Sequence, residues 1–154
     1  MSMDNSISWE VKSFEGLTNK ELYNILHLRA EVFIIEQNCP YQDMDGKDIY
    51  SFHLIGTNDR DQLMAYARLL PADISFREVS IGRVVTSPSV RKTGVGVELM
   101  KTAIQIIEEK HGKVPIRIGA QLYLKKFYER FGFIKDSEMY LEDGIEHIEM
   151  LRTA

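Results

Sequence analysis

The sequence has little that could hold it together by covalent cross-links. Its 154 residues include one cysteine, Cys39, so no disulfide can form within the chain and a reducing compartment is its natural setting. Long apolar runs are also missing, and residues 1–8 have neither the basic start nor the apolar stretch of a signal peptide. We therefore expect a single soluble domain over residues 1–154, cytoplasmic and without a membrane partner.

An excess of basic charge is absent too. The 19 lysines and arginines stand against 23 aspartates and glutamates, and the resulting formal net charge of −4 disfavours a broad nucleic-acid surface. With 44% apolar and 27% charged residues, the composition is otherwise that of an ordinary globular protein. The acidic balance fits a small amine-bearing ligand better than an anionic polymer.

Two common nucleotide-binding motifs fail at the glycine-bearing turn of residues 91–96. Lys92 precedes both glycines and no Gly-Lys-Ser/Thr follows, which excludes the phosphate loop of a kinase or hydrolase. Leu99 stands where a dinucleotide-binding turn has its third glycine. Residues 37–49 contain three aspartates, but their spacing does not match a calcium loop. No metal site is expected.

The best-defined element is a strand, a turn and the start of a helix over residues 80–100. A helix that begins on glycines presents free backbone N–H groups and the positive end of its dipole, which suits a phosphate. Without the kinase lysine or a third glycine, the turn predicts a grip for a pyrophosphate that takes no part in the reaction. The alternative is a plain strand-to-helix turn whose glycines serve packing only.

Hydrophobic periodicity along the rest of the chain predicts a mixed α/β (α+β-type) sheet with helices on its faces. A capping box of Thr18 and Glu21 begins the first helix, whose apolar positions continue to Phe33. The first four strands form an antiparallel meander, and the fifth lies parallel to the fourth because a helix connects them. The expected strands are 7–14, 50–56, 62–70, 77–85, 115–120, 133–134 and 145–151, and the later helices are 94–111 and 122–131.

Four stretches in the same order resemble the GNAT acetyltransferase superfamily, from Trp9 to Met150. Arg91-x-x-Gly94-x-Gly96 after a strand ending in two valines is similar to its acyl-CoA signature, and Phe127-Tyr-Glu-Arg-Phe-Gly-Phe133 to its second signature. Two further stretches resemble the ElaA-type branch, namely residues 29–43 and 142–147. The resemblance implies the GNAT acyl-CoA acyltransferase fold, with an antiparallel N-terminal half and a central β-α-β cofactor unit. It also implies an N-acetyltransferase in which a primary amine attacks acetyl-CoA directly.

The resemblance further implies which residues hold acetyl-CoA or coenzyme A. Backbone N–H groups of residues 91–97 would bind the pyrophosphate, and the backbones of Val84 and Val85 would pair with the pantetheine arm. A backbone N–H at the end of this strand would stabilise the developing oxyanion. Gln121 stands where many relatives have an asparagine. Whether Gln121 makes the contact that this asparagine makes in the family is left open. The expected cofactor-binding residues are Arg83, Val84, Val85, Arg91, Lys92, Thr93, Gly94, Val95, Gly96, Val97, Gln121 and Tyr128.

Two proton transfers remain to be assigned. Tyr128 falls where the family has its general-acid tyrosine, because a phenol can donate a proton to a departing thiolate; the alternative is that its ring only packs. His147 is the first candidate for the general base, since histidine titrates near neutral pH, and its alternative is a structural strand histidine. Its rivals are Glu36, His53, Asp143 and a water molecule.

The acceptor pocket is expected between residues 29–49 and 137–147. Carboxylates in these segments favour a small cationic acceptor such as a polyamine or a lysine-like amine. The expected substrate-binding residues are Arg29, Glu31, Phe33, His53 and Asp143.

Two arginines have two interpretations each. Arg29 either contacts the substrate or makes an internal ion pair that ties its helix to the sheet. Arg83 either anchors a substrate carboxylate or pairs with Glu31 or Glu36. A monomer and a homodimer are both open. The alternative function is an acyl-CoA sensor or partner-binding module of the same fold without turnover.

Overall fold

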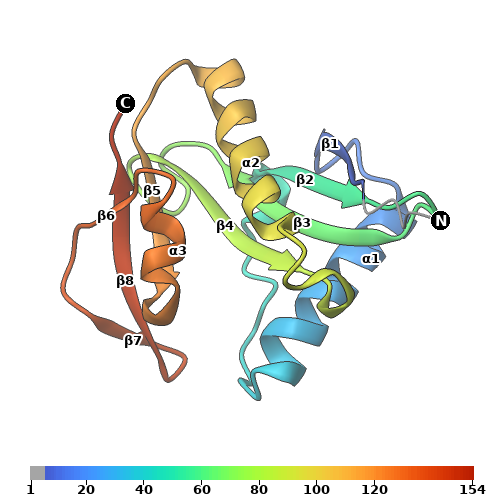
Figure 1. Cartoon of the computed structure of the whole chain (residues 1–154), viewed down its shortest axis with the longest axis horizontal. Coiled ribbons are helices and arrows are strands. Elements are labelled where there is room, and N and C mark those ends of the chain that lie inside the picture. The colour runs from blue at the N-terminus through green and yellow to red at the C-terminus, as the bar shows by residue number, and fades with distance from the viewer. Residues whose placement is uncertain (1–5) are drawn as a thin grey trace.

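The computed structural model describes residues 6–154, which form an eight-stranded sheet with helices on both faces (Figure 1). The strand order is β1-β2-β3-β4-β5-β8-β6, with β7 paired to β8 off this path. The strands are β1 (Ser8–Ser13), β2 (Phe52–Thr57), β3 (Leu63–Leu70), β4 (Val79–Thr86), β5 (Ile116–Gln121), β6 (Ile134–Lys135), β7 (Tyr140–Glu142) and β8 (Ile145–Arg152). The α-helices are α1 (Asn19–Arg29), α2 (Val95–His111) and α3 (Lys125–Glu129).

The expected mixed α/β architecture is confirmed. Strands β1 to β4 form an antiparallel meander, and β4 and β5 pair in parallel through the crossover helix α2. No helix among residues 6–154 is long and apolar enough to cross a membrane. The expectation about a signal peptide concerns residues 1–8, of which 1–5 lie outside the described residues.

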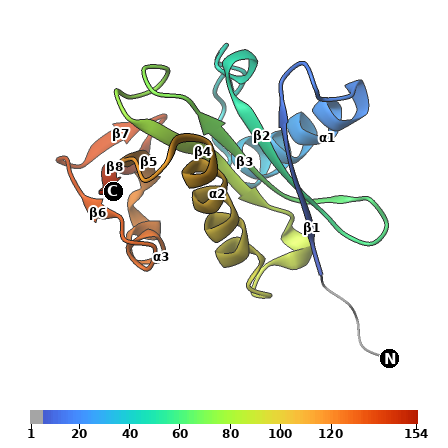
Figure 2. The same ribbon diagram turned by 90° about the horizontal axis from the view of Figure 1, so that it is seen from above.

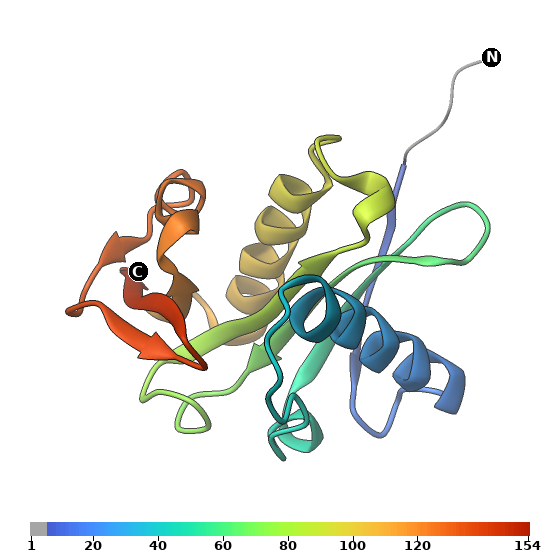
Figure 3. The same cartoon turned by 90° about the horizontal axis from the view of Figure 1, so that it is seen from below.

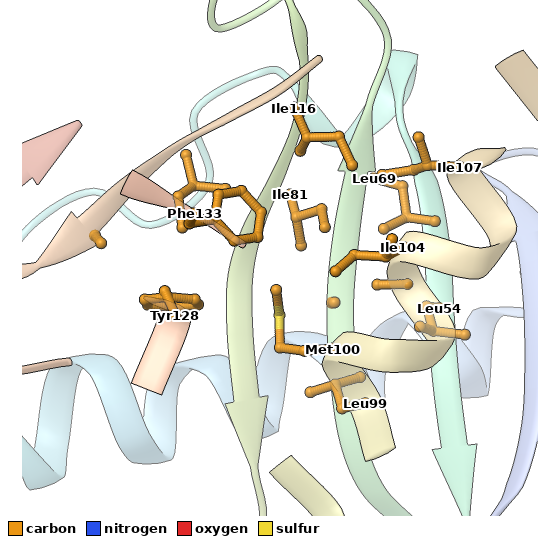
Figure 4. Packing of buried hydrophobic residues seen from close by; sticks show 14 of the residues in the cluster. Leu54, Leu69, Ile81, Leu99, Met100, Ile104, Ile107, Ile116, Tyr128 and Phe133 are labelled. Carbon is orange, nitrogen blue, oxygen red and sulfur yellow. The ribbon is translucent and has the colours of Figure 1, made fainter. Parts of the chain in front are cut away.

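The sheet has a separate apolar core on each face, because successive side chains of a strand point to opposite sides. Leu54 packs in the core under α2 and α3, whereas its neighbour Ile55 packs in the core under α1. Figures 2 and 3 show α1 and α2 on opposite faces of the sheet. Each aliphatic side chain that is fully buried here contributes about 1.5–3 kcal/mol. Figure 4 shows part of the larger core, with Leu69, Ile81, Leu99, Met100, Ile104, Ile116, Tyr128 and Phe133.

The first helix begins as the sequence predicts but does not continue as predicted. Thr18 Oγ1 accepts a hydrogen bond of 3.0 Å from the Glu21 N–H, and Glu21 Oε1 accepts one of 2.8 Å from the Thr18 N–H. After Arg29 the chain forms a π-helix, Ala30–Glu36, in place of further α-helical turns. Arg29, at the end of α1, is fully buried, whereas Glu36, at the end of the π-helix, is exposed.

Strands β4 and β5 pair over a short distance only. Their parallel ladder joins Val79 to Ile116 and Ser80 to Arg117, after which the strands diverge (Figure 1). On its other side β4 follows β3, with a register shift between Tyr66 and Arg68 on that strand. The remainder of β4 therefore has an inner edge with no strand partner.

Candidate active site

A cavity of about 920 Å³ lies where β4 and β5 part. It receives side chains from the end of the π-helix, β4, the start of α2, β5, α3 and the β7–β8 turn. The expected site residues that line it are Phe33, Glu36, Arg83, Val84, Val85, Arg91, Lys92, Gly94, Gly96, Val97, Gln121, Tyr128, Asp143 and His147. Those that do not line it are Arg29, Glu31, His53, Thr93 and Val95.

The turn before α2 is shaped to bind an anion through its backbone. Lys92 and Gly94 both have left-handed backbone conformations, with φ of 64° and 89°, which fold the turn tightly. Gly94 caps α2 without any side chain that could accept from the first N–H groups, and the first bond within the helix runs from the Glu98 N–H to the Gly94 carbonyl. The N–H groups of the first helical turn are therefore free for a ligand.

The inner edge of β4 offers an extended backbone beside this turn. The side chains of Val84 and Val85 pack in the two different cores, and both residues line the cavity. Arg83 interrupts the strand with a φ of 50°, at the register shift opposite β3. A ligand with an extended amide-bearing arm fits this edge as an added strand would.

Tyr128 projects from α3 into the cavity. Its side chain is 7% exposed and packs edge-on against Phe127 and Phe133. Burial raises the pKa of Tyr128 well above its ordinary value, so the phenol keeps its proton. Its hydroxyl has no hydrogen-bond partner within residues 6–154. A protonated, unpartnered phenol at a cavity wall is suited to act as an acid.

His147 also lines the cavity, near the start of β8. Its Nδ1 is 2.7 Å from the Ile145 carbonyl, and because a carbonyl only accepts, Nδ1 carries the hydrogen. The neutral ring therefore has its lone pair on Nε2, which lies 3.4 Å from Glu142 Oε2. The ring also stacks on Tyr140 with centroids 5.8 Å apart. This arrangement presents the basic nitrogen and places a carboxylate where it can stabilise the imidazolium.

Glu36 reaches the same cavity but is bound to Arg91 at its rim. The hydrogen bonds from Arg91, and its positive charge, lower the pKa of the Glu36 carboxyl below its ordinary value. A carboxylate with a lowered pKa is a weaker base. Glu36 is thus less suited than His147 to take a proton from an ammonium.

Arg29 and His53 belong to a buried polar cluster behind the cavity. Arg29 donates to Asp43 Oδ2 at 2.9 Å and to Asp48 Oδ1 at 2.8 Å. Of the two interpretations of Arg29, the structure therefore shows the internal ion pair. His53 contacts the Tyr66 hydroxyl at 2.7 Å through Nδ1 and the Asp48 carbonyl at 2.9 Å through Nε2. Burial lowers the pKa of His53, so the ring is neutral and its lone pair accepts from Tyr66. Neither side chain has a free group for a substrate.

The partners of Arg83 differ from those expected. Its Nε donates to Asp43 Oδ1 at 2.8 Å and its Nη2 lies 3.4 Å from Asp45 Oδ2, so the expected pairing with Glu31 or Glu36 is wrong. The reason is that the loop after the π-helix folds back over β4 and brings its aspartates to the strand. Glu31 instead lines a separate shallow pocket.

The aspartates of this loop are not free to attract a cationic acceptor. Asp45 receives both terminal nitrogens of Arg68, at 2.8 and 2.9 Å, in addition to its contact with Arg83. Burial would raise the pKa of Asp45, but the hydrogen bonds and charge of Arg68 outweigh it and lower that pKa. Arginines therefore neutralise these carboxylates within the fold.

Two contacts connect the walls of the cavity. The Gln121 amide on β5 donates to Gln37 Oε1 at 3.4 Å, and the Cys39 thiol lies 3.3 Å from the Asp143 carbonyl. Cys39 is a free, buried cysteine whose thiol takes part in this contact.

Several lining residues were missed by the sequence reasoning because they lie in loops or at strand ends with no motif. They are Tyr41, Lys47, Ser75, Phe76 and Tyr140. The aromatic residues among them carried a weak signal, since an exposed loop seldom needs several aromatic rings.

Comparison with known proteins agrees with this geometry. Residues 17–154 match the family model for the acetyltransferase (GNAT) domain. Protein ElaA of Escherichia coli (strain K12) is 43% identical over 148 residues, which cover 95% of this chain and 96% of ElaA. The crystal structure of an acyl-CoA N-acyltransferase from Pseudomonas aeruginosa has a TM-score of 0.91 at 45% identity, covering 96% of this chain and 100% of that one. The crystal structure of Escherichia coli ElaA gives 0.89 at 42%, covering 96% and 99%.

The chain therefore belongs to the GNAT acetyltransferase family, whose members are acyltransferases that use an acyl-CoA as co-substrate. Its similarity to ElaA extends over nearly the whole of both chains, which confirms the ElaA-like resemblance of the sequence motifs.

Proposed function

We propose that this protein transfers the acetyl group of acetyl-CoA to the primary amine of a small molecule by direct attack. The observation that carries the proposal is that Tyr128 and His147 line the same cavity as the uncapped start of α2. An acid, a base and an anion-binding turn around one cavity are the parts that such a transfer requires.

The chain's own residues divide the work as follows. The turn of residues 91–97 binds the pyrophosphate, and the inner edge of β4 at Val84 and Val85 aligns the pantetheine arm. When bound, acetyl-CoA supplies the thioester that the amine attacks, with the C–N bond forming as the C–S bond breaks. His147 Nε2 removes the proton that the ammonium must lose, and Tyr128 donates its proton to the departing sulfur. A backbone N–H of β4 stabilises the negative charge on the carbonyl oxygen.

The test is release of the coenzyme A thiol from acetyl-CoA in the presence of a panel of small primary amines. We expect amine-dependent release, and micromolar binding of acetyl-CoA measured by calorimetry. Replacing Gly96 by leucine adds bulk at the helix start, where a methyl group would already lie 3.8 Å from Phe127, and should abolish that binding. Absence of acetyl-CoA binding, or binding that survives in Gly96→Leu, contradicts the proposal.

The second candidate, a sensor module without turnover, predicts a different result in the same assay. A sensor would bind acetyl-CoA and release no thiol with any amine. The free hydroxyl of Tyr128, held protonated at the cavity wall, favours the enzyme because a sensor has no use for an acid there.

A further inference from the structure

One basic side chain at the cavity lacks a carboxylate partner and lies away from residues 91–97, the proposed pyrophosphate site, which we call the phosphate turn. The arginines that line the cavity are each bound to an acidic residue, Arg68 and Arg83 to aspartates and Arg91 to Glu36. Lys92 belongs to the turn after β4. Lys47 remains, and no carboxylate lies within ion-pairing distance of its Nζ among residues 6–154.

Hydrogen bonds hold both the side chain and the backbone of Lys47. Its Nζ donates to Ser75 Oγ at 3.0 Å, its backbone N–H donates to Asp45 Oδ1 at 3.0 Å, and its carbonyl accepts from Ser51 Oγ at 2.7 Å. An ammonium that is partly buried with a neutral hydroxyl as its partner still has protons to donate. It attracts an anion more strongly than an ammonium in open water.

Lys47 and the phosphate turn are at different ends of the site. Ser75 lies in the loop before β4, whereas residues 91–97 follow that strand, so the two are at opposite ends of β4. Lys47 is therefore placed to contact the acceptor rather than the pyrophosphate.

An aromatic wall connects His147 with Lys47. His147 stacks on Tyr140, and a methyl group at Gly119 would lie 3.2 Å from the Tyr140 hydroxyl and 3.8 Å from the Phe76 ring. Tyr140 and Phe76 thus both lie next to Gly119 of β5, and Phe76 is the neighbour of Ser75, the partner of Lys47. A wall of this kind suits a short alkyl chain with a polar group at each end.

We propose that the acceptor is an amine that carries a carboxylate, with Lys47 and Ser75 binding the carboxylate while the amine lies beside His147. The acidic side chains of Glu142 and Asp143 line the amine end, so the two ends of the pocket have opposite charge. This inference rests on the proposed function and reverses the cationic acceptor that the sequence favours.

The experiment compares acceptors that differ only at the end remote from the amine. At each length from four to eight carbons, the ω-amino acid, the alkylamine and the diamine are assayed with acetyl-CoA. We expect some ω-amino acid to exceed its two partners by about tenfold or more in kcat/KM, as a charge-assisted hydrogen bond provides. In Lys47→Met this preference should vanish, in Lys47→Arg it should persist, and in Lys47→Glu the diamine should become the better acceptor.

Lys101→Glu is the matched control, because it makes the same change in charge at an exposed position of α2 that does not line the cavity. No advantage of the carboxylate at any length, or an advantage that survives in Lys47→Met, overturns the inference.

A binding measurement separates this inference from the proposed function. Hexanoate has the carboxylate but no amine, so its binding to the protein in the presence of coenzyme A requires no turnover. Weaker binding to Lys47→Met than to the unaltered protein supports the Lys47 site even if no amine is acetylated. Hexanoate that does not bind, or that binds both proteins equally, overturns the site while the transfer reaction can still be observed with other amines.

Discussion

Arg91 and Glu36, 55 residues apart in the chain, hold each other by two hydrogen bonds of 2.8 and 2.5 Å at the rim of the cavity. Arg91 lies in the turn that we assign to the pyrophosphate. A phosphate oxygen and the Glu36 carboxylate therefore compete for one guanidinium.

Replacing Glu36 by glutamine should consequently tighten the binding of coenzyme A, by severalfold at most because the ion pair is exposed. Arg91→Ala should weaken binding. Calorimetric titration with coenzyme A measures both, and Glu15→Gln, at an exposed position outside the cavity, is the control. Weaker binding in Glu36→Gln would show that the carboxylate helps to position Arg91 rather than competing for it.

Tyr128→Phe should lower kcat by about 10²-fold or more, as removal of a general acid does, and leave the affinity for acetyl-CoA nearly unchanged. Because burial raises the pKa of Tyr128, the acid form persists above pH 10, the ordinary range of a phenol. Hence kcat should show no decline below that pH from loss of this proton. Equal losses in kcat and in binding would mean that Tyr128 only packs.

His147→Ala should remove the rise of the rate with pH on the acidic side, since that rise reports a base that must lose its proton. The pH dependence of kcat/KM measures it. His111→Ala, on the exposed last turn of α2, is the control and should keep the rise. An unchanged profile in His147→Ala would transfer the role to a water molecule or to Asp143.

Arg29→Met should reduce the free energy of unfolding by at most about 3–5 kcal/mol, because Asp43 and Asp48 each lose one of their two arginine partners and keep the other, Arg83 and Arg68 respectively. Denaturant unfolding measures the change. The double variant Arg29→Met with Asp48→Asn should recover part of the loss, since it also removes the negative charge of the carboxylate that has lost its Arg29 partner. A double variant less stable than the sum of the two single ones would contradict the ion-pair account.

Stability should fall on acidification in two stages. Burial would raise the pKa of Asp48, but the hydrogen bond from Arg29 and the charges of Arg29 and Arg68 lower it overall, and burial lowers the pKa of His53. Both folded-state values lie below the unfolded ones, so both contributions are present at higher pH and are lost as the pH falls. The loss should begin below about pH 6.5 for His53 and below about pH 3.9 for Asp48. Thermal unfolding across this range, with His53→Gln as comparison, should show the first stage removed in the variant.

Local signals in the sequence were sufficient for most elements of the fold. The capping box joins two residues three apart, and the antiparallel meander follows from short connections between alternating strands. The π-helix was not predicted, because Val32 and Phe33 continue the apolar spacing of the α-helix and π-helical turns are rare. What distinguishes this segment is the burial of Arg29 against aspartates that lie 14 and 19 residues further along.

The candidate site also contains residues that local motifs predict and residues that they do not. The phosphate turn and Tyr128 lie in recognisable motifs, and the structure places both at the cavity with His147. The partners of Arg83 depend on a loop that folds back across 40 residues, and no spacing rule reports such a contact. Lys47 was missed for the same reason, because the partner of its side chain, Ser75, lies 28 residues further along the chain.

The separation of β4 from β5 has a consequence for how this chain behaves among other copies of itself. Unpaired strand edges normally invite a second chain to add to the sheet. Here the open edge of β4 faces the opposite half of the same sheet, and contacts such as that of Gln37 with Gln121 connect the two walls. The protein can therefore offer bare backbone groups to a slender ligand while it denies them to a neighbouring polypeptide.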